Sequence, residues 1–136
     1  MPMSTRRPLA LALILLAAAP AVASAQSAAP ADAVARVAAA FGNTVTTLYP
    51  DGRTQKIWLR PDGTWTGLSR SHQDLAGVWS LKGDKVCLRQ KSPPTLPFSY
   101  CTAFPQDAHI GVVWTSKDFG GAPIHLKLVK GMPPTS

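Results

Sequence analysis

Short β-type runs separated by turn residues fill the chain from Asn43 onward, and they leave few folds open. Runs rich in Val, Thr, Ile, Trp and Tyr alternate with turn residues at the interval typical of an antiparallel meander. Pro50-Asp51-Gly52 and Pro61-Asp62-Gly63 each place proline where φ is preset and glycine where φ turns positive, which predicts a type I turn with a following bulge. Further reversals are expected at Lys82-Gly83-Asp84, Pro93-Pro94 and Gly120-Gly121.

The number and spacing of these runs predict an all-β domain. Eight strands form an antiparallel meander that closes into a small β-barrel of the lipocalin or avidin kind, with a β-sandwich as the alternative. One short helix precedes the sheet. Asp32 is its expected N-cap, Val34, Val37 and Phe41 follow at helical spacing, and Gly42 ends it.

Alternation assigns side chains to the two faces of the sheet. Ile57 and Leu59 share the inner face, whereas Lys56, Trp58 and Arg60 share the outer face, so Trp58 is expected to be an outward tryptophan. Leu59 should pair with Trp65 across the Pro61 turn. The other expected inward residues are Val86, Leu88, Tyr100, Phe104, Ile110, Val112, Trp114, Ile124, Leu126 and Leu128.

The first residues are arranged like a secretory signal peptide. Arg6 and Arg7 precede the apolar run from Leu9 to Ala19, and Ala23-Ser24-Ala25 is a cleavage motif. We expect residues 1–25 to be removed, 26–31 to be a flexible lead-in, 32–130 to form a single domain, and 131–136 to fray. The run is too short to stay as a membrane anchor. The expected location is therefore the periplasm, with secretion to the outside as an alternative.

Cys87 and Cys101 are an even pair, which in an exported chain indicates a disulfide and not a metal or redox site. Cys87 shares a face with Lys85 and Arg89. The bond is therefore expected to join neighbouring strands on the outer face of the sheet.

The net charge of the exported part of the chain indicates which class of partner it could bind. Without Arg6 and Arg7, twelve Lys and Arg face seven Asp and no Glu, so the exported domain is basic. This balance favours an anionic envelope component or an acidic protein as partner. Nucleic acid is not expected, because the charges are scattered singly along the chain.

No residue pattern predicts a catalytic or metal site. His72 with Asp74, and Asp107 with His109, could join His125 around a metal, but their spacing fits surface loops, so no metal and no cofactor are predicted. Ser69 and Ser71 near His72 lack a nucleophile elbow. We expect a protein that is not an enzyme.

The four tryptophans offer two interpretations. Trp58, Trp65, Trp79 and Trp114 could line an apolar pocket at the mouth of a barrel. The preferred interpretation is that most of them fill the core, because small barrels are filled by their own side chains. Trp58 is the exception, and with Lys56 and Arg60 it is the predicted contact patch.

The chain resembles two groups of secreted proteins. Trp65-Thr66-Gly67, Gly77-Val78-Trp79, Lys82-Gly83-Asp84 and the two cysteines resemble uncharacterised small secreted β-domain proteins of Gram-negative bacteria, which implies a periplasmic β domain. The stretch from Trp79 to Asp84 is also similar to one in periplasmic inhibitors of c-type lysozyme, although Leu81 is an additional residue that shifts Lys82 to the opposite face. The first hypothesis is a non-enzymatic periplasmic binding or envelope-associated module. The second is an inhibitor of a secreted hydrolase such as lysozyme, which would insert the turn around Lys82 into its target.

Overall fold

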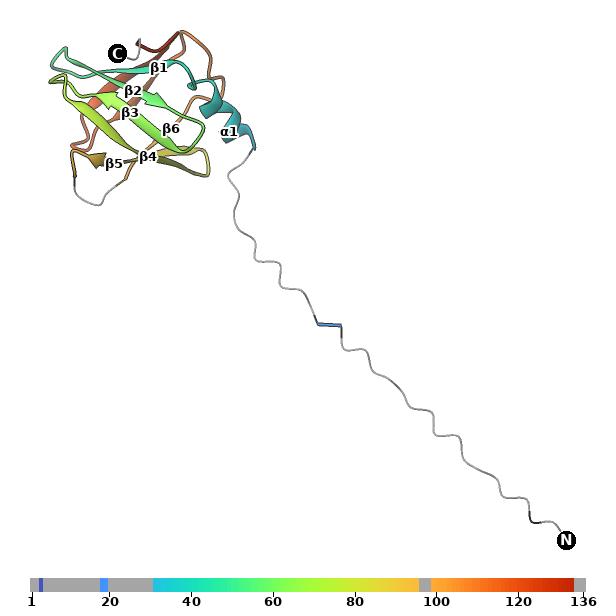
Figure 1. Ribbon diagram of the computed structural model, residues 1–136. Helices are drawn as coiled ribbons and strands as arrows, with labels where there is room; N and C mark the ends of the chain where they lie inside the picture. Colours follow the sequence, from blue (N-terminus) through green and yellow to red (C-terminus); the bar gives the residue numbers. More distant parts are fainter. Residues whose placement is uncertain (1–2, 4–17, 20–30, 96–98, 134–136) are drawn as a thin grey trace.

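Eight antiparallel strands form a nearly closed barrel with one short helix beside it in the computed structural model, which describes residues 3, 18–19, 31–95 and 99–133 (Figure 1). The all-β barrel prediction is confirmed. The helix is α1 (Ala31–Ala38), and the strands are β1 (Thr44–Leu48), β2 (Thr54–Leu59), β3 (Thr64–Leu68), β4 (Asp74–Lys82), β5 (Lys85–Ser92), β6 (Tyr100–Ala103), β7 (Val113–Lys117) and β8 (Pro123–Val129). The predicted signal peptide and lead-in lie almost wholly outside the described residues.

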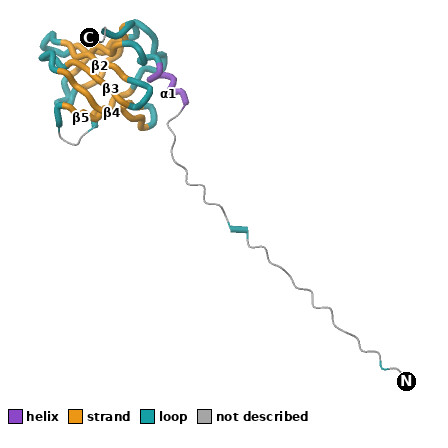
Figure 2. Tube along the Cα trace, in the orientation of Figure 1, coloured by secondary structure: helices purple, strands orange, loops and turns teal. Residues whose placement is uncertain are grey.

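The strands wrap around in chain order, with one seam. The sheet order is β6-β5-β4-β3-β2-β1-β8-β7, so β1 pairs with β8 and the two edges, β6 and β7, are neighbours in sequence. Side chains bridge these edges. The Tyr100 hydroxyl donates to the Lys117 carbonyl oxygen at 2.7 Å, and Thr102 Oγ1 lies 2.8 Å from Ser116 Oγ. Side chains thus bridge the seam between β6 and β7. The tube view shows the strands grouped in one body with α1 beside them (Figure 2).

Four of the hairpins use the same five-residue loop. In each, the first residue's N–H donates to the fifth residue's carbonyl, and the fourth residue's N–H donates to the first residue's carbonyl. The loops are 49–53, 60–64, 69–73 and 118–122. The fourth position has positive φ in all of them, and it holds Gly52, Gly63 and Gly121 but also His72, at φ 63°. The two Pro-Asp-Gly turns are thus confirmed, and the third hairpin has the same geometry without glycine.

Helix α1 closes one end of the barrel. Val37 and Ala40 are buried in the same cluster as Leu59 and Phe104. Of the residues noted at helical spacing, Val37 is buried, whereas Val34 is 46% exposed; the other buried residue of the helix is Ala33. Asp32 was the expected N-cap; that was wrong, since the helix begins at Ala31 and the Asp32 carboxylate instead accepts from Arg36 one turn later. No helix in the described ranges is long and apolar enough to cross a membrane.

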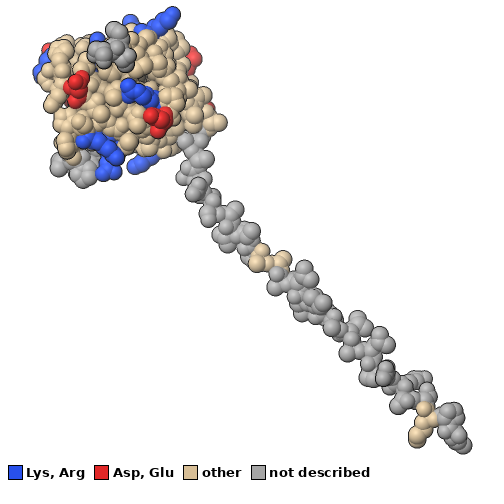
Figure 3. All heavy atoms as spheres, in the orientation of Figure 1, with Lys and Arg blue, Asp and Glu red and all other residues tan. Residues whose placement is uncertain are grey.

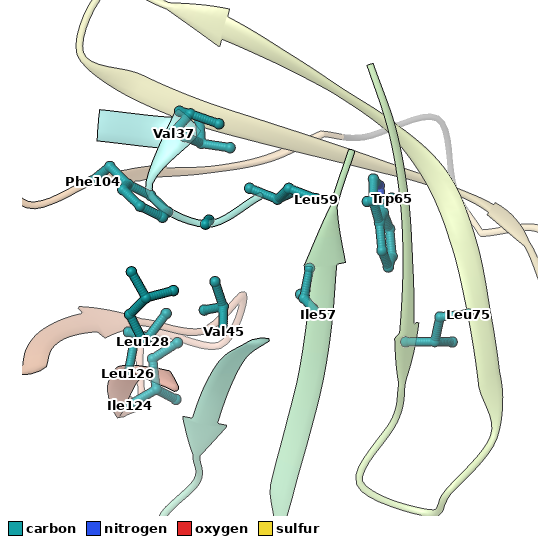
Figure 4. Close-up of a cluster of buried hydrophobic side chains, with 12 residues drawn as sticks. Val37, Val45, Ile57, Leu59, Trp65, Leu75, Phe104, Ile124, Leu126 and Leu128 are labelled. Carbon is teal, nitrogen blue, oxygen red and sulfur yellow. The ribbon is translucent and has the colours of Figure 1, made fainter. Parts of the chain in front are cut away.

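The inner face of the strands follows the predicted alternation. Leu59 pairs with Trp65 as expected, and both are buried. Figure 4 shows core side chains from several strands pointing into one interior. Ile110 is the exception: it is 45% exposed, because it lies in the connection before β7 and not on a strand.

Candidate functional site

The predicted outer patch of Lys56, Trp58 and Arg60 does not present an exposed tryptophan. Lys56 is exposed and Arg60 half-buried, but Trp58 is only 7% exposed. Its indole Nε1–H donates to Thr44 Oγ1 at 2.8 Å. The side chain faces outward, as alternation predicts, yet it is packed against the protein. An aromatic platform at this place is therefore excluded.

Hydrogen bonds link Trp58 through Thr44 to the end of the chain. Thr44 Oγ1 in turn donates to the Gly131 carbonyl oxygen at 2.8 Å, and the Gly131 N–H donates to Asn43 Oδ1 at 3.0 Å. Gly131 belongs to the segment expected to fray, and these two hydrogen bonds hold its backbone, whereas 134–136 lie outside the described residues. The hydrogen bonds fix the segment after β8 over the outer face of β1.

The predicted disulfide joins Cys87 of β5 to Cys101 of β6, which are directly opposite each other in the sheet. Its placement on the outer face is confirmed, because neighbouring residues on both strands, such as Val86 and Thr102, line the interior. Cys87 is buried and Cys101 is exposed. The bond secures β6, which forms one edge of the seam.

The interior of the barrel is a cavity of about 950 Å³, and this is the main difference from the sequence-based expectation that side chains fill it. An eight-stranded barrel is wide enough to hold one small ligand when its interior side chains leave room. The deep wall of the cavity is apolar and includes Ile57, Leu59, Trp65, Phe104, Trp114 and Leu126. Trp65 and Trp114 line this cavity, whereas Trp58 and Trp79 are not among its lining residues, so the interpretation that tryptophans line a pocket holds for two of the four.

The cavity opens at the end of the barrel opposite α1. Hairpin loops alternate between the two ends of a meander, so loops 49–53, 69–73 and 118–122 share the end away from the helix. Residues of all three loops line the cavity. The polar lining residues there include Tyr49, Arg53, Gln55, Ser69, Arg70, Ser71, Gln73 and Asp118. The cavity therefore combines an apolar floor with a polar mouth.

The mouth residues are held by one another. The Arg53 and Arg70 guanidiniums both bind Asp51 Oδ2, at 2.9 Å and 3.2 Å. The Arg53 backbone N–H and then its side chain lower the pKa of the Asp51 carboxyl, which keeps that group ionised. Burial raises the pKa of the Tyr49 phenol, so it stays a neutral donor. Its hydroxyl lies 3.0 Å from Gln55 Oε1.

The chain was compared with family models, curated proteins and solved structures. No family model, curated protein or solved structure matches this chain. The resemblances to secreted Gram-negative proteins and to lysozyme inhibitors stay predictions, and the proposed function depends on the geometry of the cavity.

The residues considered for a metal or a catalytic site are not brought together. His72 lies in the hairpin at the mouth, whereas Asp107 and His109 lie in the β6–β7 connection at the other end, and the exposed His125 lies on β8. Within the described ranges, no group of three or more His, Cys, Asp or Glu side chains could hold a metal ion. Ser69 Oγ lies 3.0 Å from Ser71 Oγ and accepts from the Gln73 backbone N–H, which is a loop-stabilising role.

The turn that the inhibitor hypothesis needs is accessible. Lys82, Gly83, Asp84 and Lys85 are all exposed at the β4–β5 hairpin, at the closed end of the barrel. On the face drawn in Figure 3, Lys and Arg side chains lie in several small groups with acidic side chains near some of them.

Sequence reasoning missed the arginines of the mouth. Arg53 and Arg70 are far apart in the chain and meet only because successive hairpins return to the same end of the barrel. The one signal in the sequence was that Arg53 directly follows a Pro-Asp-Gly turn.

Proposed function

We propose that this protein is a non-enzymatic binding module of the periplasm that holds a small molecule with an apolar body inside its barrel. The observation that carries the proposal is the cavity of about 950 Å³ with an apolar floor and one polar mouth. Ligand pockets of proteins span roughly 300 to 1,000 Å³ and combine a mostly apolar lining with a few polar groups that orient the ligand.

The floor of the cavity offers contact area for such a ligand. Trp65 and Phe104 are buried, and the ring centroids of Phe104 and Trp114 are 5.2 Å apart, so aromatic rings form part of the wall. Each buried aromatic side chain contributes a large apolar surface. Trp114 Nε1 is buried without a hydrogen-bond partner among the described residues. A ligand acceptor near this nitrogen would satisfy it.

The proposed compartment is supported by the leader-like first residues and by the disulfide. Disulfides form and persist in oxidising compartments. The bond between Cys87 and Cys101 is compatible with such a location.

Binding of a neutral fluorescent probe tests the proposal. N-phenylnaphthylamine should bind the purified protein and quench tryptophan emission, because Trp65 and Trp114 line the cavity. Leu88→Trp adds bulk on the lumen side of β5 and should weaken binding by roughly tenfold or more, which corresponds to about 1.4 kcal/mol.

Val113→Trp is the matched control, since Val113 is 60% exposed on the outer face of β7 and the same substitution there leaves the cavity open. Thermal unfolding of each variant verifies that it is folded. Failure of the wild-type protein to bind the probe, or equal binding by both variants, contradicts a ligand in the lumen.

A further inference from the structure

Two arginines from different hairpins converge on the mouth of the cavity. Arg53 ends the β1–β2 loop and Arg70 lies in the β3–β4 loop, and both line the cavity. Asp51, whose Oδ2 atom binds both guanidiniums, is not among the lining residues. The carboxylate therefore orients the two arginines from outside the cavity.

The two arginines bring more positive charge to the mouth than Asp51 alone offsets, and Asp118 is the other charged residue of the lining. One carboxylate faces two guanidiniums, so the three side chains of Asp51, Arg53 and Arg70 carry a net charge of +1. Each guanidinium has five N–H donors in a planar fork that fits carboxylate or phosphate oxygens. Two guanidiniums offer more donors than the single Asp51 carboxylate can accept.

Packing holds the second arginine in place. The Arg70 guanidinium carbon lies 4.1 Å from the centre of the Tyr49 ring. Tyr49 is anchored in turn by its hydrogen bond to Gln55, and both residues line the cavity. A guanidinium that is already oriented loses less conformational entropy when it binds an anion.

Asp118 is the acidic residue of the lining, and it is engaged with its own turn. Its Oδ1 atom accepts from the backbone N–H groups of Gly120 and Ala122, at 2.9 Å each. The carboxylate thus stabilises the β7–β8 loop. A cationic ligand would have to compete with these two hydrogen bonds.

We propose that the ligand is an amphipathic anion, whose apolar body lies in the lumen and whose carboxylate, sulfonate or phosphate head binds Arg53 and Arg70. This inference rests on the proposed function and adds the chemical class of the ligand. Head and body are recognised at opposite ends of one cavity, which favours an elongated molecule that enters body first.

Displacement of N-phenylnaphthylamine by three ten-carbon compounds, decanoate, decanol and decylammonium, tests the class of head group. Decanoate should displace the probe at roughly tenfold lower concentration than decanol, because charge-assisted hydrogen bonds are stronger than neutral ones. In the Arg53→Gln, Arg70→Gln double variant, the affinity for decanoate should fall to that for decanol, and the affinity for decanol should not change.

Arg89→Gln is the matched control, since Arg89 is exposed on the outer face of β5. It should keep the preference for decanoate. Equal displacement by decanoate and decanol overturns the anionic head but leaves binding in the lumen intact. Tighter binding of decylammonium also overturns it and assigns the mouth to a cation through Asp118. If the probe itself does not bind, both proposals fall.

Discussion

His72 occupies a backbone position that the other equivalent hairpins give to glycine, and replacing it should stabilise the protein. Among the described residues, it is the one non-glycine with positive φ. A left-handed conformation costs an L-residue about 1–2 kcal/mol. Glycine avoids this cost but loses about 0.5–1 kcal/mol more backbone entropy on folding. His72 is exposed, so its side chain buries little, and His72→Gly should raise the free energy of unfolding by about 0.5–1 kcal/mol.

Urea denaturation followed by tryptophan fluorescence measures this gain as a higher midpoint with an unchanged slope. The matched control is Gly121→His at the same loop position in the β7–β8 hairpin. A Cβ atom on Gly121 would meet nothing within 4 Å, so the control tests backbone conformation without a steric clash. It should lower the free energy of unfolding by a similar amount. A stability loss in His72→Gly, or no loss in Gly121→His, would refute the reasoning.

Three other changes have definite outcomes. Replacing both Cys87 and Cys101 with serine should lower the free energy of unfolding by about 3 kcal/mol, measured by urea denaturation. The two cysteines are 14 residues apart, and their bond closes a loop in the unfolded chain. Gly77→Ala should cost about 1–3 kcal/mol in the same assay, because the new Cβ would collide with the Arg89 carbonyl oxygen. Burial raises the pKa of Tyr49 in the folded state, so the contribution of this phenol to stability should be full below about pH 10 and fall as pH rises through the folded pKa. Thermal unfolding measures this pH profile, and Tyr49→Phe should flatten its alkaline part.

Local features of the fold were predictable because they depend on short stretches of chain. The Pro-Asp-Gly turns need only a preset φ followed by a positive one, and Gly52 and Gly63 provide it. Alternation placed Leu59 and Trp65 inside for the same reason, since side chains of a strand point to opposite faces. Both inferences use neighbours in sequence, and both are confirmed.

The exposure of Trp58 could not be read from alternation. Its side chain points outward as predicted, but the segment at Gly131 returns to that face through Thr44, a contact across almost the whole domain. The pattern of the β8 strand contains no signal for this return. A face assignment therefore does not predict solvent exposure, because an outward side chain such as Trp58 can still be packed against the protein.

The cavity could not be predicted from the sequence either. Whether an eight-stranded barrel is filled depends on its diameter and on how far its inner side chains reach, and a periodic pattern reports neither. Arg70 reaches Asp51 only because the β1–β2 and β3–β4 loops return to the same end of the sheet. The contact patch predicted from the sequence lies on the outer face of the barrel, whereas the proposed ligand site lies inside it, so the patch stays an untested prediction.

The pairing of β1 with β8 also governs the order in which the molecule can form. β1 pairs with β2 on one side and with β8 on the other, so one edge of β1 stays unpaired until β8 has been made. During synthesis, the hairpins from β1 to β6 can associate early, but the ladder that closes the wall needs a partner from the far end of the domain. Until then the interior is open along its length, and the growing chain exposes a β-strand edge to any neighbour able to pair with it.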